Sequence, residues 1–377
     1  MAGMKAVVSS AEPVSPGDPR IGQPIEWLDS PSLLLDRAAS DRNLQRMAQF
    51  FQSRSAQLRP HFKNHKCVTL AKRQLAAGAV GMTCAKLSEA EVLVAHGFDD
   101  VLIANQVVGE RKLRRLAGLA RQARIAVAVD HPQQVAALTE VAAEADATIY
   151  VLVEVDIGMG RCGVAPGKST LELGQLVMQA PQLKFDGLQA FEGHLVNVLD
   201  RQERSVRART DMQRAVDTRR LLEEAGLPVA RISGCSTSTY DVTGVMDGVD
   251  EVQAGSYATM DCQYQRLTPE FDVALSVLTR VISRPSPDRA VLDVGVKGAG
   301  GEFGVPQIRG FPEVEIPFFL SEEHLVVRNV PDWKIADTLQ MIPSHSCTTC
   351  NLYREMIVHE NGVVVDVWPI EASGRLS

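Results

Sequence analysis

Short apolar runs alternate with helical patterns over residues 57 to 255. Eight of these runs are short and rich in small and branched residues, as strands buried on both faces are. They are Gln57–His61, Val80–Cys84, Val101–Ala104, Ile125–Val129, Ile149–Val155, Asp186–Phe191, Ala230–Gly234 and Asp250–Ala254. Helical spacing of apolar residues predicts helices over Cys67–Ala77, Ser88–His96, Glu110–Ala123, Pro132–Ala145 and around Arg201–Ala225.

Eight strands that alternate with helices over about 200 residues predict an α/β protein with a (β/α)8 TIM barrel. The alternative is an open, doubly wound sheet. No G-x-G-x-x-G motif follows the first run, and eight strands are the number that closes a barrel. The pattern therefore favours the barrel.

The pattern changes after about residue 270, where strand-like runs are separated by proline, glycine and asparagine with little helical period. This predicts a second, mainly β domain. Its expected strands are Val273–Ile282, Ala290–Val294, Val314–Phe318, Thr338–Ile342, Glu355–His359 and Val363–Trp368. We expect three parts: a leader and N-terminal segment over 1–28, which is a candidate to pack on the β domain, a barrel over 29–270, and the β domain over 271–377. The extended run Pro31–Asp36 is expected to lead into the barrel.

Composition excludes several classes of protein. The chain has 377 residues, 45% of them hydrophobic, which is ordinary for a globular protein. A net charge of −7 gives no basic surplus for nucleic acid or an anionic membrane, and no apolar run approaches the ~20 residues of a membrane span. Residues 1–20 are typical of a flexible leader rather than a signal peptide. Seven scattered cysteines indicate a reducing cytoplasm rather than a disulfide framework.

The chemically distinctive residues follow the carboxyl ends of the predicted strands, where barrel active sites are built. Lys63 follows the first strand between His61 and His65, so it is either a solvated surface lysine or a nucleophile able to form a Schiff base. The loops after the seventh and eighth strands are either ordinary turns or a phosphate cradle, because small residues let backbone N–H groups approach an anion. The cradle residues are Gly234, Cys235, Ser236, Thr237, Gly255, Ser256 and Tyr257.

A strand-end lysine opposite a phosphate cradle suggests pyridoxal phosphate. Gln189, at the end of the sixth strand, and Arg161, after the fifth, are further candidates to contact this cofactor. The sequence leaves open whether Arg161 faces the pyridine nitrogen or the phenolic oxygen of the ring.

A candidate metal pair lies in the second domain. His345 and Cys347 are separated by one residue, and on an extended segment this spacing points both side chains to the same face. Imidazole and thiolate together suit zinc or a similar divalent metal. Cys350 is a third candidate ligand.

These motifs together resemble the fold-type III pyridoxal-phosphate enzymes, in the group of D-threonine aldolases and D-serine dehydratases with an alanine-racemase-like N-terminal domain. The resemblance spans nearly the whole chain. Its anchors are Asp29–Leu33, Arg59–Lys66, Lys86–Ala90, Val153–Gly163, Gln253–Tyr257, Leu292–Gly295, Pro343–Asn351 and Asp366–Ile370.

The resemblance implies that Lys63 carries the cofactor, that the two loops hold its phosphate, and that His345 and Cys347 bind a divalent metal (Zn, Mn or Mg). It also implies a homodimer with the active site at the interface.

The expected activity is a lyase that cleaves a D-β-hydroxy-α-amino acid to glycine and an aldehyde, with His61, His65 or His194 as the base. The main alternative is β-elimination by a D-serine or 3-hydroxyaspartate dehydratase, because His-x-Cys resembles that branch whereas familiar aldolases carry His-x-Asp. A racemase would not explain the His-x-Cys pair. A non-catalytic carrier would lack Lys63 or that pair, and both are present.

Overall fold

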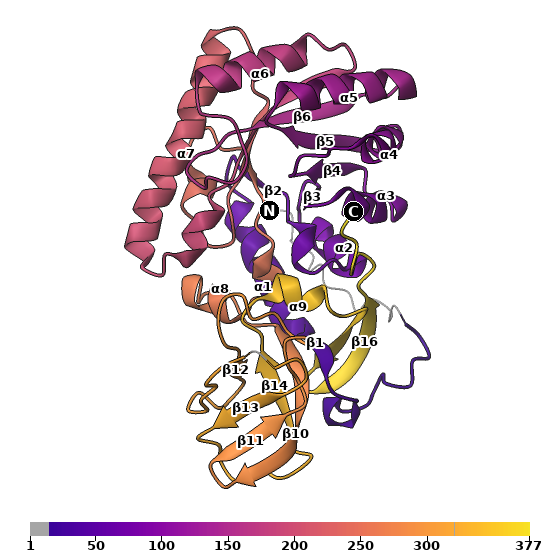
Figure 1. Ribbon diagram of the computed structural model, residues 1–377, viewed down its shortest axis with the longest axis vertical. Helices are drawn as coiled ribbons and strands as arrows, with labels where there is room; N and C mark the ends of the chain where they lie inside the picture. Colours follow the sequence, from indigo (N-terminus) through magenta and orange to yellow (C-terminus); the bar gives the residue numbers. More distant parts are fainter. Residues whose placement is uncertain (1–14, 320) are drawn as a thin grey trace, which may run out of the picture. The chain divides into compact units, whose positions relative to one another are not determined.

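The computed structural model describes residues 15–319 and 321–377. Within this part the chain divides into two compact units that interleave along the sequence (Figure 1). The β unit comprises residues 15–47, Asn64–Ala77 and Ser256–Gly374, and the barrel unit comprises Ala48–Lys63, Gly78–Gly255 and Arg375–Ser377. Most of the expected leader falls on residues 1–14, outside the described residues.

The barrel unit is built on one sheet of eight parallel strands. They are β2 (Gln57–Leu58), β3 (Met82–Cys84), β4 (Asp100–Ile103), β5 (Arg124–Val129), β6 (Ile149–Glu154), β7 (Leu183–Ala190), β8 (Arg231–Gly234) and β9 (Glu251–Val252). Their order is β2-β9-β8-β7-β6-β5-β4-β3, and a parallel bridge between His61 and Thr83 joins the two ends. The sheet therefore closes on itself, and each strand overlaps one of the eight predicted runs, which confirms the expected barrel.

Small and branched side chains fill the interior of this sheet. Leu102, Ala126 and Leu152, from the neighbouring strands β4, β5 and β6, form one fully buried cluster. A barrel interior is filled in such layers, with side chains from different strands. This is why the strands read as continuous apolar runs instead of alternating ones.

Five helices belong to the barrel unit: α3 (Leu87–Ala95), α4 (Glu110–Ala120), α5 (Pro132–Ala145), α6 (Lys168–Met178) and α7 (Arg201–Glu224). The sequence patterns predict four of them and miss α6, which begins after Gly167 and contains Gly174. Glycine ordinarily signals a turn. At Gly174, however, an added Cβ would lie 2.6 Å from Leu227 Cδ2, so this glycine permits close packing of the helix.

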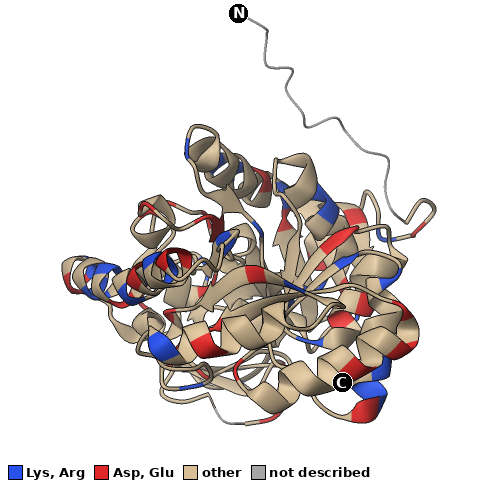
Figure 2. Cartoon of the chain, turned by 90° about the horizontal axis from the view of Figure 1, so that it is seen from above, with Lys and Arg blue, Asp and Glu red and all other residues tan. Residues whose placement is uncertain are grey.

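Basic and acidic residues are interspersed along several of the helices (Figure 2). On α7, Arg207 pairs with Glu203 at 3.2 Å and Arg219 pairs with Glu223 at 2.9 Å. Pairs at this i,i+4 spacing support a helix modestly. Among the described residues, no helix is long and apolar enough to cross a membrane.

The β unit contains the second eight-stranded sheet, with the order β12-β14-β10-β1-β15-β16. Strand β11 also pairs with β10, and β13 pairs with β11. Its strands are β1 (Ser32–Asp36), β10 (Leu275–Ser286), β11 (Arg289–Leu292), β12 (Gln307–Ile308), β13 (Leu325–Arg328), β14 (Thr338–Ile342), β15 (Glu355–Glu360) and β16 (Val363–Pro369). Helices α2 (Val68–Ala76), α8 (Cys262–Leu267) and α9 (Ser346–Cys350) also belong to it, and α1 (Arg37–Phe51) starts there. The strand expected over Val314–Phe318 is wrong: only a single bridge forms, at Glu315, and Pro312 and Pro317 flank it.

Strand β1 precedes the first barrel strand along the chain, but it belongs to the sheet of the β unit, where it pairs with β10 on one side and with β15 on the other. Leu33, Leu34 and Leu35 are all buried, which suits a central strand with both faces covered. The preceding segment runs along β16, where Gly22 N donates to Val364 O at 2.8 Å. The compact units thus differ from the sequence boundaries expected near residues 28 and 270.

Candidate active site

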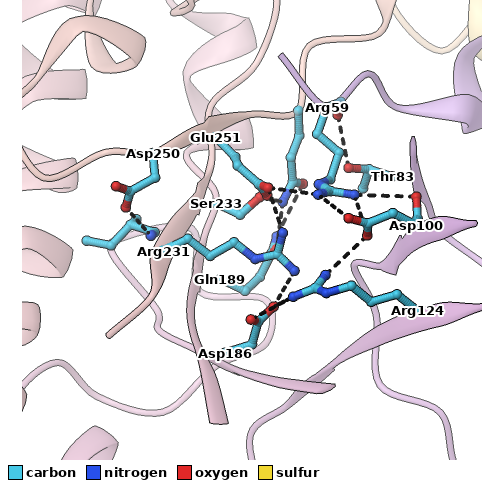
Figure 3. Close-up of polar contacts among 12 residues, drawn as sticks. Arg59, Thr83, Asp100, Arg124, Asp186, Gln189, Arg231, Ser233, Asp250 and Glu251 are labelled. Carbon is cyan, nitrogen blue, oxygen red and sulfur yellow. Dashed lines mark hydrogen bonds and ion pairs between the residues drawn. The ribbon is translucent and has the colours of Figure 1, made fainter. Parts of the chain in front are cut away.

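The amino end of the barrel is closed by a ring of six alternating charges (Figure 3). Four of the six residues are the first residue of a strand. In ring order they are Arg59, Asp100, Arg124, Asp186, Arg231 and Glu251, and Glu251 returns to Arg59. Arg59 and Arg231 are nearly buried, so each depends on its two carboxylate neighbours for compensation.

Next to this ring, a chain of amides links the strands β7, β8 and β9. Gln253 Nε2 donates to Gln189 Oε1 at 2.7 Å and to Ser233 Oγ at 2.9 Å. All three residues are buried. The amides therefore fix the strand ends immediately before the residues that line the cavity described next.

A cavity of about 170 Å³ lies at the carboxyl ends of the barrel strands. Its lining comes from residues at or after the ends of β2, β3, β4, β6, β7 and β9. The lining residues are His61, Lys63, Ala85, Ala104, Asn105, Gln106, Glu154, Arg161, Cys162, Gln189, Phe191 and Gln253. The structure thus brings together four of the predicted site residues, namely Lys63, His61, Arg161 and Gln189.

Lys63 and Arg161 share one aromatic neighbour in this cavity. Lys63 Nζ lies 5.6 Å from the centre of the Phe191 ring, and Arg161 Cζ lies 5.5 Å from the same centre. His61 is nearly buried, and its Nδ1 accepts a 3.4 Å hydrogen bond from the backbone N–H of Lys63. A primary amine and a guanidinium thus share one aromatic neighbour, and an imidazole lines the same cavity.

A buried carboxylate lies beside Arg161. Glu154 Oε1 is 3.6 Å from Arg161 Nη2, and Glu154 Oε2 accepts from Gln106 Nε2 at 2.5 Å. Burial raises the pKa of Glu154, and the hydrogen bond from Gln106 and the charge of Arg161 only partly offset this. Sequence reasoning missed both Glu154 and Gln106. Glu154 lies one residue before the end of the predicted run Ile149–Val155, and this position near a strand end could have marked it as a site residue.

The predicted phosphate loop after β8 is a tight, hydroxyl-rich turn. Gly234 has no room for a side chain, since an added Cβ would lie 1.7 Å from Ala190 O. Cys235 adopts a left-handed backbone with φ +64°, and Ser236 Oγ lies 2.7 Å from Ser238 Oγ. Gly255 ends the barrel unit, whereas Ser256 and Tyr257 belong to the β unit. The assignment of these loop residues and of Thr237 to a phosphate stays a prediction.

Two of the three candidate bases are engaged away from the cavity. His65 is fully buried, its Nε2 lies 3.1 Å from Gln74 Oε1, and burial lowers its pKa to about 4. Gln74 also donates to the hydroxyl of Tyr257 at 3.0 Å. His194 Nε2 lies 3.0 Å from Asp211 Oδ2. His61 is the candidate base that lines the cavity.

In the β unit, His345 and Cys347 lie at the start of helix α9. His345 is the N-cap, with extended backbone angles, and Cys347 belongs to the helix. The segment is therefore not extended throughout. The expectation that an extended backbone points the side chains of His345 and Cys347 to the same face is wrong. The two side chains nevertheless interact: burial opposes a charge on His345, but Cys347 and Asp261 outweigh it and raise the pKa of His345 well above its ordinary value.

Asp261 orients this pair. Its Oδ2 lies 3.0 Å from His345 Nδ1 and accepts from Ser346 N at 2.8 Å, and the carboxylate is fully buried. A carboxylate on one imidazole nitrogen is the usual outer partner of a metal-ligating histidine. Cys347 Sγ accepts from Asn64 Nδ2 at 3.5 Å, while Cys350 is fully buried. No cluster of three or more His, Cys, Asp or Glu side chains within the described residues is arranged as a metal site.

Comparison with known proteins identifies the family. The model of the alanine racemase N-terminal domain matches residues 35–263. The chain belongs to this family. A second model, of a serine dehydratase domain, matches residues 274–359.

The relatives agree with this assignment. The chain is 40% identical to a D-threonine aldolase from Arthrobacter sp., over 96% of each protein. It is 34% identical to a 3-hydroxy-D-aspartate aldolase from Paracoccus denitrificans, over 92% of this chain and 93% of the relative. The crystal structure of a D-threonine aldolase from Filomicrobium marinum superposes with a TM-score of 0.93 at 40% identity, covering 95% of this chain and 99% of that one. The fold-type III architecture and the family expected from the sequence are confirmed.

Sequence reasoning missed Asp261, which contacts His345 of the candidate metal pair. It lies 84 positions before His345, as the N-cap of helix α8, and accepts from Tyr264 N at 2.8 Å. An N-cap aspartate is common before a helix, so nothing in the local pattern sets it apart. The contact of Asp261 with His345 becomes visible only in the folded protein, where these two segments lie side by side.

Proposed function

We propose that the protein is an aldolase, dependent on pyridoxal phosphate and a divalent metal, that cleaves a D-β-hydroxy-α-amino acid such as D-threonine to glycine and an aldehyde. The observation that carries this proposal is the amine of Lys63 in a cavity at the carboxyl ends of the barrel strands, beside Arg161 and Phe191. The 40% identity to a D-threonine aldolase over 96% of each chain supports the same reaction.

The residues present fit pyridoxal phosphate. Lys63 would hold the cofactor covalently through its amine, Arg161 and Phe191 would contact the ring, and the loop after β8 would face the phosphate. When bound, this cofactor supplies an electron sink for the carbanion left by carbon–carbon cleavage. The guanidinium of Arg161 would favour negative charge on the ring atom that it faces.

His61 is the group we propose to take the proton of the substrate hydroxyl. General base catalysis requires a basic atom within hydrogen-bonding reach of the proton, in its neutral form. His61 lines the cavity and follows the same strand end as Lys63. His65 stays uncharged, and its Nδ1 accepts from the backbone N–H of Cys67, the N-cap of α2, at 3.1 Å, so it is better suited to holding the start of that helix.

The donor set of His345 and Cys347 fits a divalent metal of the zinc type, with Asp261 orienting the imidazole. Such a metal, when bound, supplies Lewis acidity to an oxygen ligand of the substrate. Two protein ligands leave the remaining positions to water and substrate.

The products distinguish the aldolase from its main alternative. Purified protein supplied with pyridoxal phosphate and Zn²⁺ or Mn²⁺ is expected to convert D-threonine to glycine and acetaldehyde, and to leave L-threonine unchanged. D-Serine tests β-elimination in parallel, since that reaction gives a keto acid and ammonia. Keto acid and ammonia without glycine, measured by chromatography and an ammonia assay, would reject the aldolase.

Elimination stays the second candidate because a specific observation favours it. His-x-Cys is present here, and a D-threo-3-hydroxyaspartate dehydratase from Delftia sp. superposes with a TM-score of 0.84 at 26% identity over 92% of this chain. The two reactions need the same residues and differ in which substrate bond is held perpendicular to the ring. The higher identity to aldolases makes cleavage the main proposal.

Removing the metal ligand should separate metal binding from folding. Cys347→Ala is expected to lower bound metal, measured by elemental analysis, to less than about a tenth of the wild-type content, because an imidazole alone binds weakly. Cys350→Ala, three residues later in the same helix, is the matched control and is expected to keep its metal. Equal metal loss in both variants would contradict the assigned pair.

Assembly and location complete the proposal. We propose a homodimer, as the resemblance implies, and a cytoplasmic location. The seven cysteines form no disulfide, and five of them are buried, as suits a reducing compartment. The substrate would be a small D-amino acid.

A further inference from the structure

Directly behind the loop after β8 lies a buried acid that the proposed chemistry does not use. Glu192 follows strand β7, and only 1% of its surface is exposed. Its Oε1 accepts hydrogen bonds from Thr239 Oγ1 at 2.6 Å and from Thr243 Oγ1 at 2.7 Å. Within the described part of the chain, no lysine, arginine or histidine forms an ion pair with it, and its Oε2 has no hydrogen-bond partner. Such an arrangement costs stability, so it calls for a reason.

The hydroxyl of Thr239 connects Glu192 to the loop backbone. Thr239 Oγ1 donates to Glu192 and accepts from the backbone N–H of Ser236 at 3.1 Å. Thr239 N in turn donates to Ser236 O at 3.2 Å. The position of Ser236 is therefore set by a chain of two hydrogen bonds that ends on the Glu192 carboxyl.

The residue before Ser236 needs such support. Cys235 has a left-handed backbone, with φ +64°, which disfavours any residue that has a Cβ. A strained conformation persists only where surrounding contacts determine it, and strained residues cluster at ligand sites. Ser236 directly follows Cys235, and its N–H is held by Thr239, which in turn is held by Glu192. Glu192 and Thr239 therefore help to stabilise the left-handed conformation of Cys235.

From this geometry we infer that Glu192 is the positioning residue of the phosphate-binding loop: through the hydroxyl of Thr239 it holds the backbone of Ser236 in the shape that receives a phosphate monoester. This inference rests on the proposed function, since it takes the loop as the cofactor's phosphate site. Burial also raises the pKa of Glu192, although the threonine hydrogen bonds oppose the shift. A weaker tendency to ionise suits an acid placed behind an anion site, because it lowers charge repulsion.

The test compares pyridoxal phosphate with pyridoxal, which lacks the phosphate. Both can react with Lys63, so their absorbance on titration into cofactor-free protein reports binding. Glu192→Leu is expected to raise the dissociation constant of pyridoxal phosphate about 10- to 100-fold. For pyridoxal we expect a change of less than about 3-fold. If Glu192 only stabilised the fold, its replacement would weaken the binding of pyridoxal phosphate and of pyridoxal to the same extent.

Three companion variants keep the inference falsifiable even if Glu192→Leu does not fold. Glu192→Gln keeps an acceptor for the threonines and is expected to bind pyridoxal phosphate within about 3-fold of the wild type. Thr239→Val removes the linking hydroxyl and should reproduce the selective loss, whereas Thr243→Val, which leaves the link to Ser236 intact, should have a smaller effect. Equal weakening of both ligands in Thr239→Val, or none, overturns the role of Glu192. Wild-type protein that binds neither ligand overturns the proposed function together with this inference.

Discussion

Lys63→Ala is expected to abolish the absorbance band of bound cofactor near roughly 410–430 nm and the cleavage of D-threonine. Lys63 is the half-buried amine in the cavity, and its Nζ lies 5.6 Å from the Phe191 ring. Without an amine, no covalent attachment to the cofactor aldehyde can form at this strand end. The rate constant should fall by at least the roughly 10²–10⁴-fold that a single catalytic group contributes, since the cofactor would no longer be held covalently.

Two other lysine substitutions make this result specific. Lys63→Arg keeps the positive charge but cannot serve as the attaching nucleophile, so it should be as inactive as Lys63→Ala. Lys72→Ala removes an exposed lysine from α2 and should retain both the absorbance band and the activity. A band that persists in Lys63→Ala, or activity within a few-fold of the wild type, would contradict the proposed attachment site.

The barrel could be predicted because its strands are buried on both faces. Runs such as Ile125–Val129 leave few polar positions, and all eight runs contain or overlap a strand. Helix α6 was missed because Gly167 and Gly174 resemble turn signals, although Gly174 serves close packing. The strand over Val314–Phe318 was wrong because apolar content alone does not supply hydrogen-bonding partners.

The sequence predicted those site residues whose position follows from the end of a barrel strand. Lys63, Arg161 and Gln189 meet at one cavity because the carboxyl ends of parallel strands meet at one edge. The direction of a side chain beyond a strand end follows no such rule, so the three histidines could not be ranked. Contacts with the helices that follow them distinguish two of the three: Gln74 on α2 contacts His65, and Asp211 on α7 contacts His194.

The charge ring at the amino end of the barrel could not be predicted from the sequence either. We expect the loss of one of its carboxylates to cause the largest decrease in stability. Glu251→Leu would leave Arg59 and Arg231, both nearly buried, each without one of its two carboxylates. Breaking a buried charge pair in this way costs about 3–5 kcal/mol. We therefore expect a large fall in the thermal unfolding midpoint, measured by circular dichroism. Glu203→Gln, which removes an exposed carboxylate paired with Arg207 at 3.2 Å, should change stability by less than about 1 kcal/mol.

Acid provides an independent check on the ring, using Glu251→Gln, which removes the charge and keeps the shape. Burial raises the pKa of Glu251, but the charges of Arg59 and Arg231 outweigh it, so the net pKa lies below the ordinary value of 4.5. Because the folded pKa is lowered, the carboxylate stabilises the protein above that ordinary value, and this stabilisation is lost as pH falls through the lowered pKa. The difference in unfolding midpoint between wild type and Glu251→Gln should therefore be constant near neutral pH and shrink in acid. A difference that stays the same or grows on acidification would show that Glu251 contributes through its shape and hydrogen bonds and not through its charge.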